Sequence, residues 1–270
     1  MRAALRDDRE GGDFGRGLAV QRRALHALMI RELMTRYGRG NIGFLWLILE
    51  PMILCAGVIG LRYLIQAHEE HGVSVVGLLL SGYMPLTLWR HLTNRGAHLP
   101  SRSKGILYHR DITLIDMFLM TMALEFIGCT VAFVMNYAAL IAINAINPIV
   151  DYGLVCGGWL AMGVLAFSIS ALIAVLTEYH EASERFIQPI QYLILPICGF
   201  LFMVDWLPTG VQKIAWYMPM VHCFEMVRAG FYGDSVVTHY DIWYPLAFGG
   251  VILAIYFPMI EKTRDRIALS

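Results

Sequence analysis

Charged residues and nucleotide-binding motifs are scarce in this sequence. Asp, Glu, Lys and Arg make up only 16% of the 270 residues, against about 25% in average globular proteins. The formal net charge is zero, which argues against nucleic acid as a partner. The sequence contains no G-x-x-x-x-G-K-[ST] loop that would cradle a phosphate. We therefore expect no cofactor site and no ATPase site in this chain.

Catalytic and metal-binding groupings are also missing from the sequence. The nine histidines form no HExxH motif, and the five cysteines include no CxxC pair. His68 and His71 flank two glutamates in a short loop, where a solvated turn is a better explanation than metal capture. We expect no catalytic residue and no metal site, and cysteines that serve as small buried hydrophobes.

Apolar residues are abundant instead, at 57% of the chain, which is typical of membrane proteins. A helix that crosses a bilayer needs about 20 mostly apolar residues. The segments that meet or approach this length are 42–66, 73–91, 117–146, 152–177, 187–204 and 242–260. We therefore predict an all-α membrane protein with six transmembrane helices.

The fifth predicted span differs from the others because it is short and carries Pro189 and Pro196. Proline removes a backbone donor and kinks a helix. A broken helix at membrane depth is tolerated only against protein or a water-filled path. We expect an interrupted helix here, paired as a hairpin with the residues that follow, and this interruption is a first indication of transport.

The basic residues indicate the orientation of the spans. With the N-terminus in the cytoplasm, the loops on that side hold all but three of the 21 Lys and Arg residues. Only Arg62, Lys213 and Arg228 then lie outside. Because cytoplasmic loops are enriched in Lys and Arg, both termini are predicted to be cytoplasmic.

The part of the chain before the first span divides into two regions. Residues 1–17 form a polar tail, and residues 18–40 place leucines at three- and four-residue intervals with arginines on other faces. This spacing predicts an amphipathic helix that lies in the membrane interface. A plain membrane anchor explains the spacing equally well. Residues 41–270 then form the transmembrane domain.

The predicted spans contain few acidic residues: Glu50, Asp116 and Glu125. None has a basic partner at helical spacing, and carriers driven by an ion gradient usually need buried ionisable groups. Glu50 lies directly before Pro51 inside an apolar run. Since a carboxylate exposed to lipid is costly, we expect Glu50 to face the protein interior, in a structural role rather than in contact with substrate.

The loop from Leu92 to Asp111 is basic and is therefore predicted to be cytoplasmic. After Pro100 it reads as a short helix with serines as caps. Its apolar patch would give the bundle a surface on which a partner protein can dock. A solvated basic loop that only sets topology is the alternative. The residues of this coupling segment are Lys104, Ile106, Leu107 and Tyr108.

The external stretch "WYMPMVHCFEMVRAGFY" at 216–232 combines aromatic residues with Glu225 and Arg228 at i, i+3. Aromatic side chains favour the boundary between water and lipid, and the two charges can form an ion pair along one helix face. We interpret this stretch as a structural cap on the bundle, in preference to a substrate contact.

The stretch "RELMTRYGRGNIGFLWLILEPMIL" at residues 31–54 resembles the start of the membrane subunit of capsule polysaccharide exporters, in the type 2 family of ATP-binding-cassette transporters. The stretches "LLLSGYMPLTLWR", "ILYHRDITLIDMFLMTMALEF" and "YMPMVHCFEMVRAGFYG" also fit this family. The resemblance implies a half-transporter with an N-terminal interfacial helix, a cytoplasmic coupling element and external re-entrant helices. It implies that two copies form the path and that each binds a separate ATPase subunit.

The resemblance also suggests which residues meet the substrate. The basic half of the first stretch would rest at the cytoplasmic headgroups, where a lipid-linked anionic glycan would arrive. Sugar rings stack well on aromatic faces, so some aromatic residues of the spans would line its path. The candidates are Arg31, Arg36, Tyr37, Arg39, Trp46, Glu50, Tyr83, Trp89, Phe118 and Phe126.

These observations favour a permease subunit of the bacterial inner membrane, which works as a homodimer with an ATPase and exports lipid-linked capsular polysaccharide. Periplasmic or outer-membrane export proteins are further candidate partners. One alternative is an exporter of O-antigen, teichoic acid or a smaller amphiphile. Another is a membrane-embedded enzyme such as an acyltransferase, which would need a cluster of His, Asp or Ser at one depth.

Overall fold

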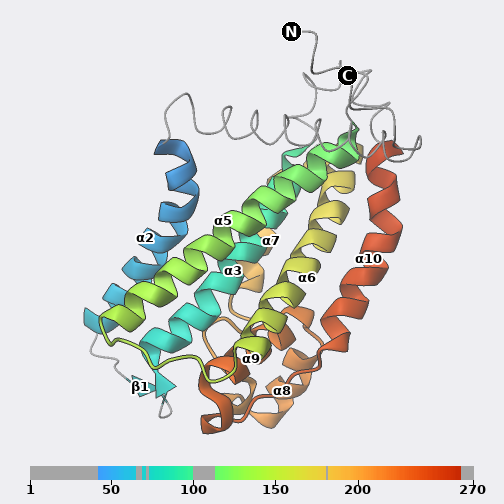
Figure 1. The fold of residues 1–270 in the computed structure, drawn as a ribbon. Coiled ribbons are helices and arrows are strands. Elements are labelled where there is room, and N and C mark those ends of the chain that lie inside the picture. Colours follow the sequence, from blue (N-terminus) through green and yellow to red (C-terminus); the bar gives the residue numbers. More distant parts are fainter. Residues whose placement is uncertain (1–41, 65–68, 71–72, 100–112, 181, 263–270) are drawn as a thin grey trace, which may run out of the picture.

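Long helices form a bundle whose two ends differ in structure (Figure 1). The computed structural model describes residues 42–64, 69–70, 73–99, 113–180 and 182–262. The helices of the bundle are α2 (Ile42–Leu64), α3 (Val75–Ala97), α5 (Leu114–Ala142), α6 (Tyr152–Tyr179), α7 (Ala182–Ile194) and α10 (Trp243–Lys262). The other described elements are β1 (Glu69–Glu70), β2 (Val73–Ser74), η1 (Val204–Trp206), α8 (Thr209–Trp216), α9 (Pro219–Tyr232) and η2 (Gly233–Ser235).

The two ends of the bundle contain different elements (Figure 1). At the α3–α5 end, α3 finishes and α5 begins, and α6 and α10 also finish there (Figure 1). At the α8–α9 end, short helices and loops close the bundle. The strands β1 and β2 pair antiparallel, with Glu69 opposite Ser74, in the turn between α2 and α3. By the charge distribution, the α3–α5 end is the predicted cytoplasmic end.

Three helices of the described residues are long and apolar enough to cross a membrane: α5, α6 and the Trp243–Ile260 part of α10. The prediction of a helical membrane protein is therefore confirmed. α2 and α3 have 23 residues each, which at about 1.5 Å per residue also reaches across the hydrocarbon core. The count of six spans and the re-entrant helices remain predictions, as do the polar tail at 1–17 and the interfacial helix at 18–40, which lie outside the described residues.

α6 lies at the centre of the packing and contacts α3, α9 and α10. Its approach to α9 depends on glycine. A Cβ atom on Gly158 would lie only 2.7 Å from Val227 Cγ2 and 2.9 Å from the Val227 backbone nitrogen. Gly230 of α9 is as tight, because a Cβ there would lie 2.6 Å from the Asp151 carbonyl oxygen. Small residues of this kind let two helix backbones come close together.

Side-chain caps fix where α5 and α6 begin. Thr113 accepts a hydrogen bond from the Asp116 backbone N–H at 3.0 Å, and the Asp116 carboxylate accepts from the Thr113 N–H at 3.2 Å, which makes a capping box. Asp151 likewise accepts from the N–H groups of Gly153 and Leu154. Asp116, one of the three acids in the predicted spans, is thus part of a helix cap.

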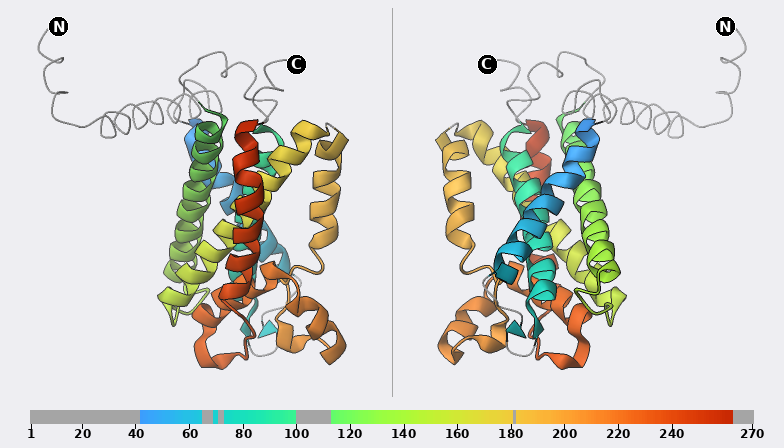
Figure 2. Two further views of the ribbon diagram at one scale, coloured as in Figure 1. Left: turned by 90° about the vertical axis from the view of Figure 1, so that its right-hand side faces the viewer. Right: turned by 90° about the vertical axis from the view of Figure 1, so that its left-hand side faces the viewer.

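The span predicted over 187–204 is helical only as far as Ile194. α7 begins at Ala182 and has 13 residues, which is about 20 Å and too short for a bilayer core of about 30 Å. Beyond α7 the chain turns through residues 195–203, and Gly199 has a φ of +93° that other residues rarely adopt. α7 itself stands at the edge of the bundle (Figure 2).

Candidate functional site

Several residues predicted to act at the cytoplasmic end lie outside the described residues. They are Arg31, Arg36, Tyr37, Arg39, Lys104, Ile106, Leu107 and Tyr108. Trp46 lies in α2, but its side chain is outside the described part of the chain. The roles of all these residues therefore stay predictions.

The aromatic residues proposed for a substrate path pack mainly inside the bundle. Phe118 is fully buried, with its ring centroid 5.0 Å from that of Phe167. Trp89 is 3% exposed, and Phe126 lies beside Trp159 with 6.4 Å between ring centroids. Tyr83 is half-buried. In a single chain these side chains do not converge on one open surface.

Glu50 is exposed on α2 in the single chain. A single chain does not enclose this carboxylate, and its expected place in the protein interior stays a prediction. α2 packs against α3 and α5, and Glu50 lies on the part of α2 that these helices leave uncovered. A carboxylate in this position needs protein or water beside it in a membrane.

Glu125 forms a buried polar cluster with α3 that no motif in the sequence indicates. Its carboxylate is fully buried in α5 and accepts hydrogen bonds from Arg95 Nε at 2.6 Å and His91 Nδ1 at 3.1 Å. Helical spacing within one span does not indicate these partners, because they come from a neighbouring helix. The cluster joins α3 to α5 close to the loop predicted to couple to an ATPase.

A second polar contact at the same end joins α7 to α3. The Gln191 side-chain amide donates to Thr93 Oγ1 at 2.9 Å and to Asn94 Oδ1 at 3.0 Å. The neighbouring Tyr192 lies under the Arg90 guanidinium, with 5.2 Å from Arg90 Cζ to the ring centroid. α7 is therefore tied to α3 by polar contacts, although it stands at the edge of the bundle.

At the α8–α9 end, Arg228 of α9 is fully buried and donates hydrogen bonds to backbone carbonyls of the turn that follows α7. Its guanidinium donates to the carbonyl oxygens of Gly199 at 2.8 Å, Phe200 at 2.7 Å and Phe202. A non-helical turn inside a membrane protein leaves carbonyls that need donors. Arg228 supplies these donors from a rigid helix, because its planar fork presents several N–H groups at once.

Glu225 lies one turn before Arg228, with 3.9 Å from Arg228 Nη1 to Glu225 Oε1. Its carboxylate accepts from the Val204 N–H at 3.1 Å and from the His239 N–H at 3.0 Å. Both charged side chains are buried. The pair predicted at i, i+3 is thus close in space, and its members also bind two separate backbone segments at this end of the bundle, residues 199–204 and His239.

His222 of α9 makes two further contacts. Its Nδ1 atom accepts a hydrogen bond from the Asp241 N–H at 2.9 Å, so the imidazole proton must be on Nε2, which donates to the Trp216 carbonyl at 2.9 Å. This arrangement uses the neutral ring. Burial lowers the pKa of His222 below its usual value of 6.5, although the Trp216 carbonyl and Asp241 oppose this shift.

Acidification is expected to loosen the α8–α9 end through His222. Because the folded-state pKa is lowered, the unfolded state binds more protons below pH 6.5, so the stabilisation is complete above that pH and is lost as the pH falls. Intrinsic exchange slows as the pH falls, so the hydrogen exchange of residues 204–243, expressed relative to the intrinsic rates, should show an excess at pH 5 over pH 7.5. A His222→Gln variant should lose this excess. An equal excess in both proteins would contradict the assignment.

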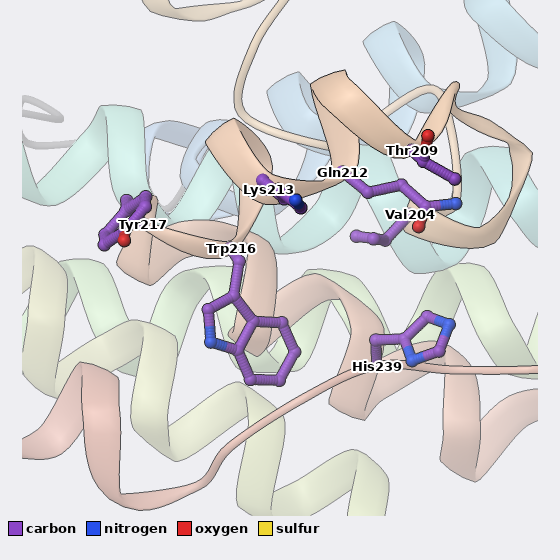
Figure 3. Close-up of a pocket in the computed structure, with 7 residues that line it drawn as sticks. All are labelled: Val204, Thr209, Gln212, Lys213, Trp216, Tyr217 and His239. Atoms are coloured by element: carbon purple, nitrogen blue, oxygen red, sulfur yellow. The ribbon is translucent and has the colours of Figure 1, made fainter.

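A pocket of about 460 Å³ opens at the same end. α8 supplies Thr209, Gln212, Lys213 and Trp216, and the wall is completed by Val204, Tyr217 and His239. Figure 3 shows these side chains along α8, with the rings of Trp216 and His239 on one side of the helix and Tyr217 at the far end from Thr209. No motif in the sequence indicates this pocket, although Lys213 is one of the three basic residues that the predicted topology leaves outside.

The match to known families decides the classification. Residues 23–232 match the family described as ABC-2 type transporter, which is most of the chain. The chain belongs to the ABC-2 transporter membrane family. The family predicted from sequence resemblance is therefore confirmed. The matched region of this ABC-2 protein extends from before α2 to the end of α9, and α10 follows it.

Several curated proteins are similar to this ABC-2 chain over nearly their whole length. The capsule polysaccharide export inner-membrane protein CtrC of Neisseria meningitidis serogroup B is 34% identical over 92% of this chain and 94% of its own. The capsule polysaccharide export inner-membrane protein BexB of Haemophilus influenzae is 31% identical over the same shares. The polysialic acid transport protein KpsM of Escherichia coli is 23% identical over 94% of this chain and 98% of its own.

Proposed function

We propose that this chain is the permease subunit of an ATP-driven exporter that moves lipid-linked capsular polysaccharide across the bacterial inner membrane. One observation carries the proposal: the likeness to a capsule polysaccharide export protein at 34% identity, over 92% of this chain and 94% of that protein. Apolar helices long enough to span a bilayer support the placement in a membrane. Both termini and the α3–α5 end face the cytoplasm in this proposal.

The chain takes its energy from a separate ATPase subunit, because its sequence has no phosphate-cradling loop. The ATPase docks on the cytoplasmic segment that holds Lys104, Ile106, Leu107 and Tyr108. That segment lies between α3 and α5, and the buried Glu125 contacts join these two helices near it. A movement of the docked segment would therefore be carried into both helices together.

The permease works as a homodimer with a central path in this proposal. The exposed position of Glu50 on α2 supports a second copy, because a carboxylate facing lipid alone would be costly. A neighbouring chain, or a polar path between two chains, would provide the environment that a single chain does not. Arg31, Arg36, Tyr37 and Arg39 would then receive the anionic glycolipid at the cytoplasmic surface. Periplasmic or outer-membrane export proteins would receive the glycan beyond the membrane.

Deletion of the gene tests this proposal. Loss of the permease should remove capsular glycan from the cell surface and leave it inside the cell, since synthesis does not depend on export. Complementation with the wild-type gene should restore the surface glycan. The measurement is the ratio of surface to intracellular glycan, read with a glycan stain before and after permeabilisation. A deletion strain with a normal ratio would show that the chain exports something else.

A further inference from the structure

The pocket beside α8 has a wall that combines aromatic, cationic and neutral polar side chains. Trp216 and Tyr217 are 43% and 76% exposed, so their rings are open to a ligand. Gln212 is oriented by its side-chain amide, which donates to the Leu207 carbonyl at 2.9 Å. In the external stretch 195–243 the sequence holds only two Lys or Arg residues, Lys213 and Arg228. Arg228 is buried against carbonyls, so Lys213 is the exposed one.

Buried side chains of α9 hold this wall in place. Glu225 accepts from the backbone N–H groups of both Val204 and His239, which come from two different segments of the pocket. His222 holds the Trp216 carbonyl, and its ring packs edge-on to the Trp216 indole with 4.6 Å between centroids. Two residues one turn apart on one helix therefore fix three parts of the pocket. A pocket fixed in this way does not have to be ordered when a ligand binds.

The chemistry of the wall matches an acidic sugar. Aromatic rings offer flat apolar faces to the C–H groups of a sugar ring, and Gln212 and Thr209 can exchange hydrogen bonds with hydroxyl groups. Lys213 can pair with a carboxylate or phosphate. His239 lies 3.6 Å from Asp205 Oδ1 and is thereby partnered on its own side of the pocket. The volume of about 460 Å³ lies within the range of small-molecule sites.

We propose that this pocket binds one or two acidic sugar units of the glycan at the end of the permease where it leaves, with Trp216 under a sugar ring and Lys213 on the anionic group. The inference rests on the proposed function, because it takes the exported glycan as the ligand. It adds a site outside the residues predicted for the substrate path. The pocket retains the glycan after it has crossed the membrane, before another protein receives it.

Binding is tested on the full chain in lipid nanodiscs, together with any ATPase that purifies with it. The probe is tetragalacturonic acid, and maltotetraose is the uncharged comparison, both measured by isothermal titration calorimetry. Lys213→Ala should weaken tetragalacturonate binding roughly tenfold and leave maltotetraose unchanged. Trp216→Ala should weaken both sugars. Lys213→Arg should retain binding, and Ile214→Ala is the matched control because Ile214 is 63% exposed on α8 but does not line the pocket.

The same variants in a deletion strain separate the two claims. If the wild-type gene fails to restore surface glycan, the proposed function is wrong whatever the pocket binds. If the wild type restores export but tetragalacturonate binds no better than maltotetraose, or binds Lys213→Ala equally well, the sugar site is wrong. Loss of export in Lys213→Ala with unchanged sugar binding would also overturn it, in favour of a protein partner at this pocket.

Discussion

The Arg228→Ala variant is expected to lower the melting temperature of the solubilised protein by roughly 10 °C. Removing one partner of a buried charge pair costs about 3–5 kcal/mol, and in a chain of this size 1 kcal/mol corresponds to roughly 2–4 °C. The Arg228→Ala change removes two kinds of interaction. Glu225 is left as a buried charge, and the carbonyls of Gly199, Phe200 and Phe202 lose their donor.

Arg185 provides the matched control for Arg228. It is an exposed arginine on α7, and an Arg185→Ala change removes the same side chain without emptying a buried site. Its melting temperature should stay within about 1 °C of the wild type, because exposed charges contribute little to stability. The melting temperature of Arg228→Lys should lie between those of the wild type and Arg228→Ala, since an ammonium cannot donate to three carbonyls in the planar geometry of a guanidinium. Equal melting temperatures for the two alanine variants would contradict the role given to Arg228.

Replacing Glu125 with leucine is expected to be the second large effect, at about 3–5 kcal/mol of lost stability. The change leaves Arg95 and His91 without the carboxylate to which they donate. Because the cluster joins α3 to α5, ATPase activation by the permease should fall together with thermal stability. Both are measured on the purified complex, as melting temperature and as ATP turnover.

The double variant Glu125→Leu, Arg95→Met separates lost charge pairing from lost packing. A buried ion pair can often be replaced by apolar residues of similar volume with little loss of stability. The double variant should therefore be more stable than Glu125→Leu alone, with a coupling energy of about 1–3 kcal/mol. If the stability lost in the double variant equals the sum of the losses in Glu125→Leu and Arg95→Met alone, Glu125 and Arg95 do not stabilise the bundle as a pair.

Helix positions could be predicted because the apolar runs and their caps are local properties of the sequence. The segment predicted as 152–177 corresponds to α6, which begins at Tyr152 because Asp151 caps its first turn. In the segment predicted as 187–204, Pro189 and Pro196 also indicated that the helix would be interrupted. The length of the helical part could not be predicted from the local sequence. The helix ends at Ile194, and the carbonyls of the turn that follows accept hydrogen bonds from Arg228, which is distant in the sequence.

The polar sites were harder to predict because their partners are far apart in the sequence. Glu125 was recognised as an acid in a span, but Arg95 lies 30 residues away on another helix. Glu225 and Arg228 were recognised as a pair from their spacing, whereas their backbone partners lie as far as 29 residues upstream. The role of His222 could not be predicted from the local sequence, since only the fold brings Trp216 and Asp241 to its two ring nitrogens.

Co-purification from native membranes tests the central claim most directly. The chain, tagged at its C-terminus and extracted under mild conditions, should bring with it an ATPase subunit and a lipid-linked acidic glycan, both identified by mass spectrometry. Serine at Ile106, Leu107 and Tyr108 should release the ATPase without preventing membrane insertion. The account is contradicted if the wild-type chain, in membranes that export the glycan, purifies with neither an ATPase nor a glycolipid.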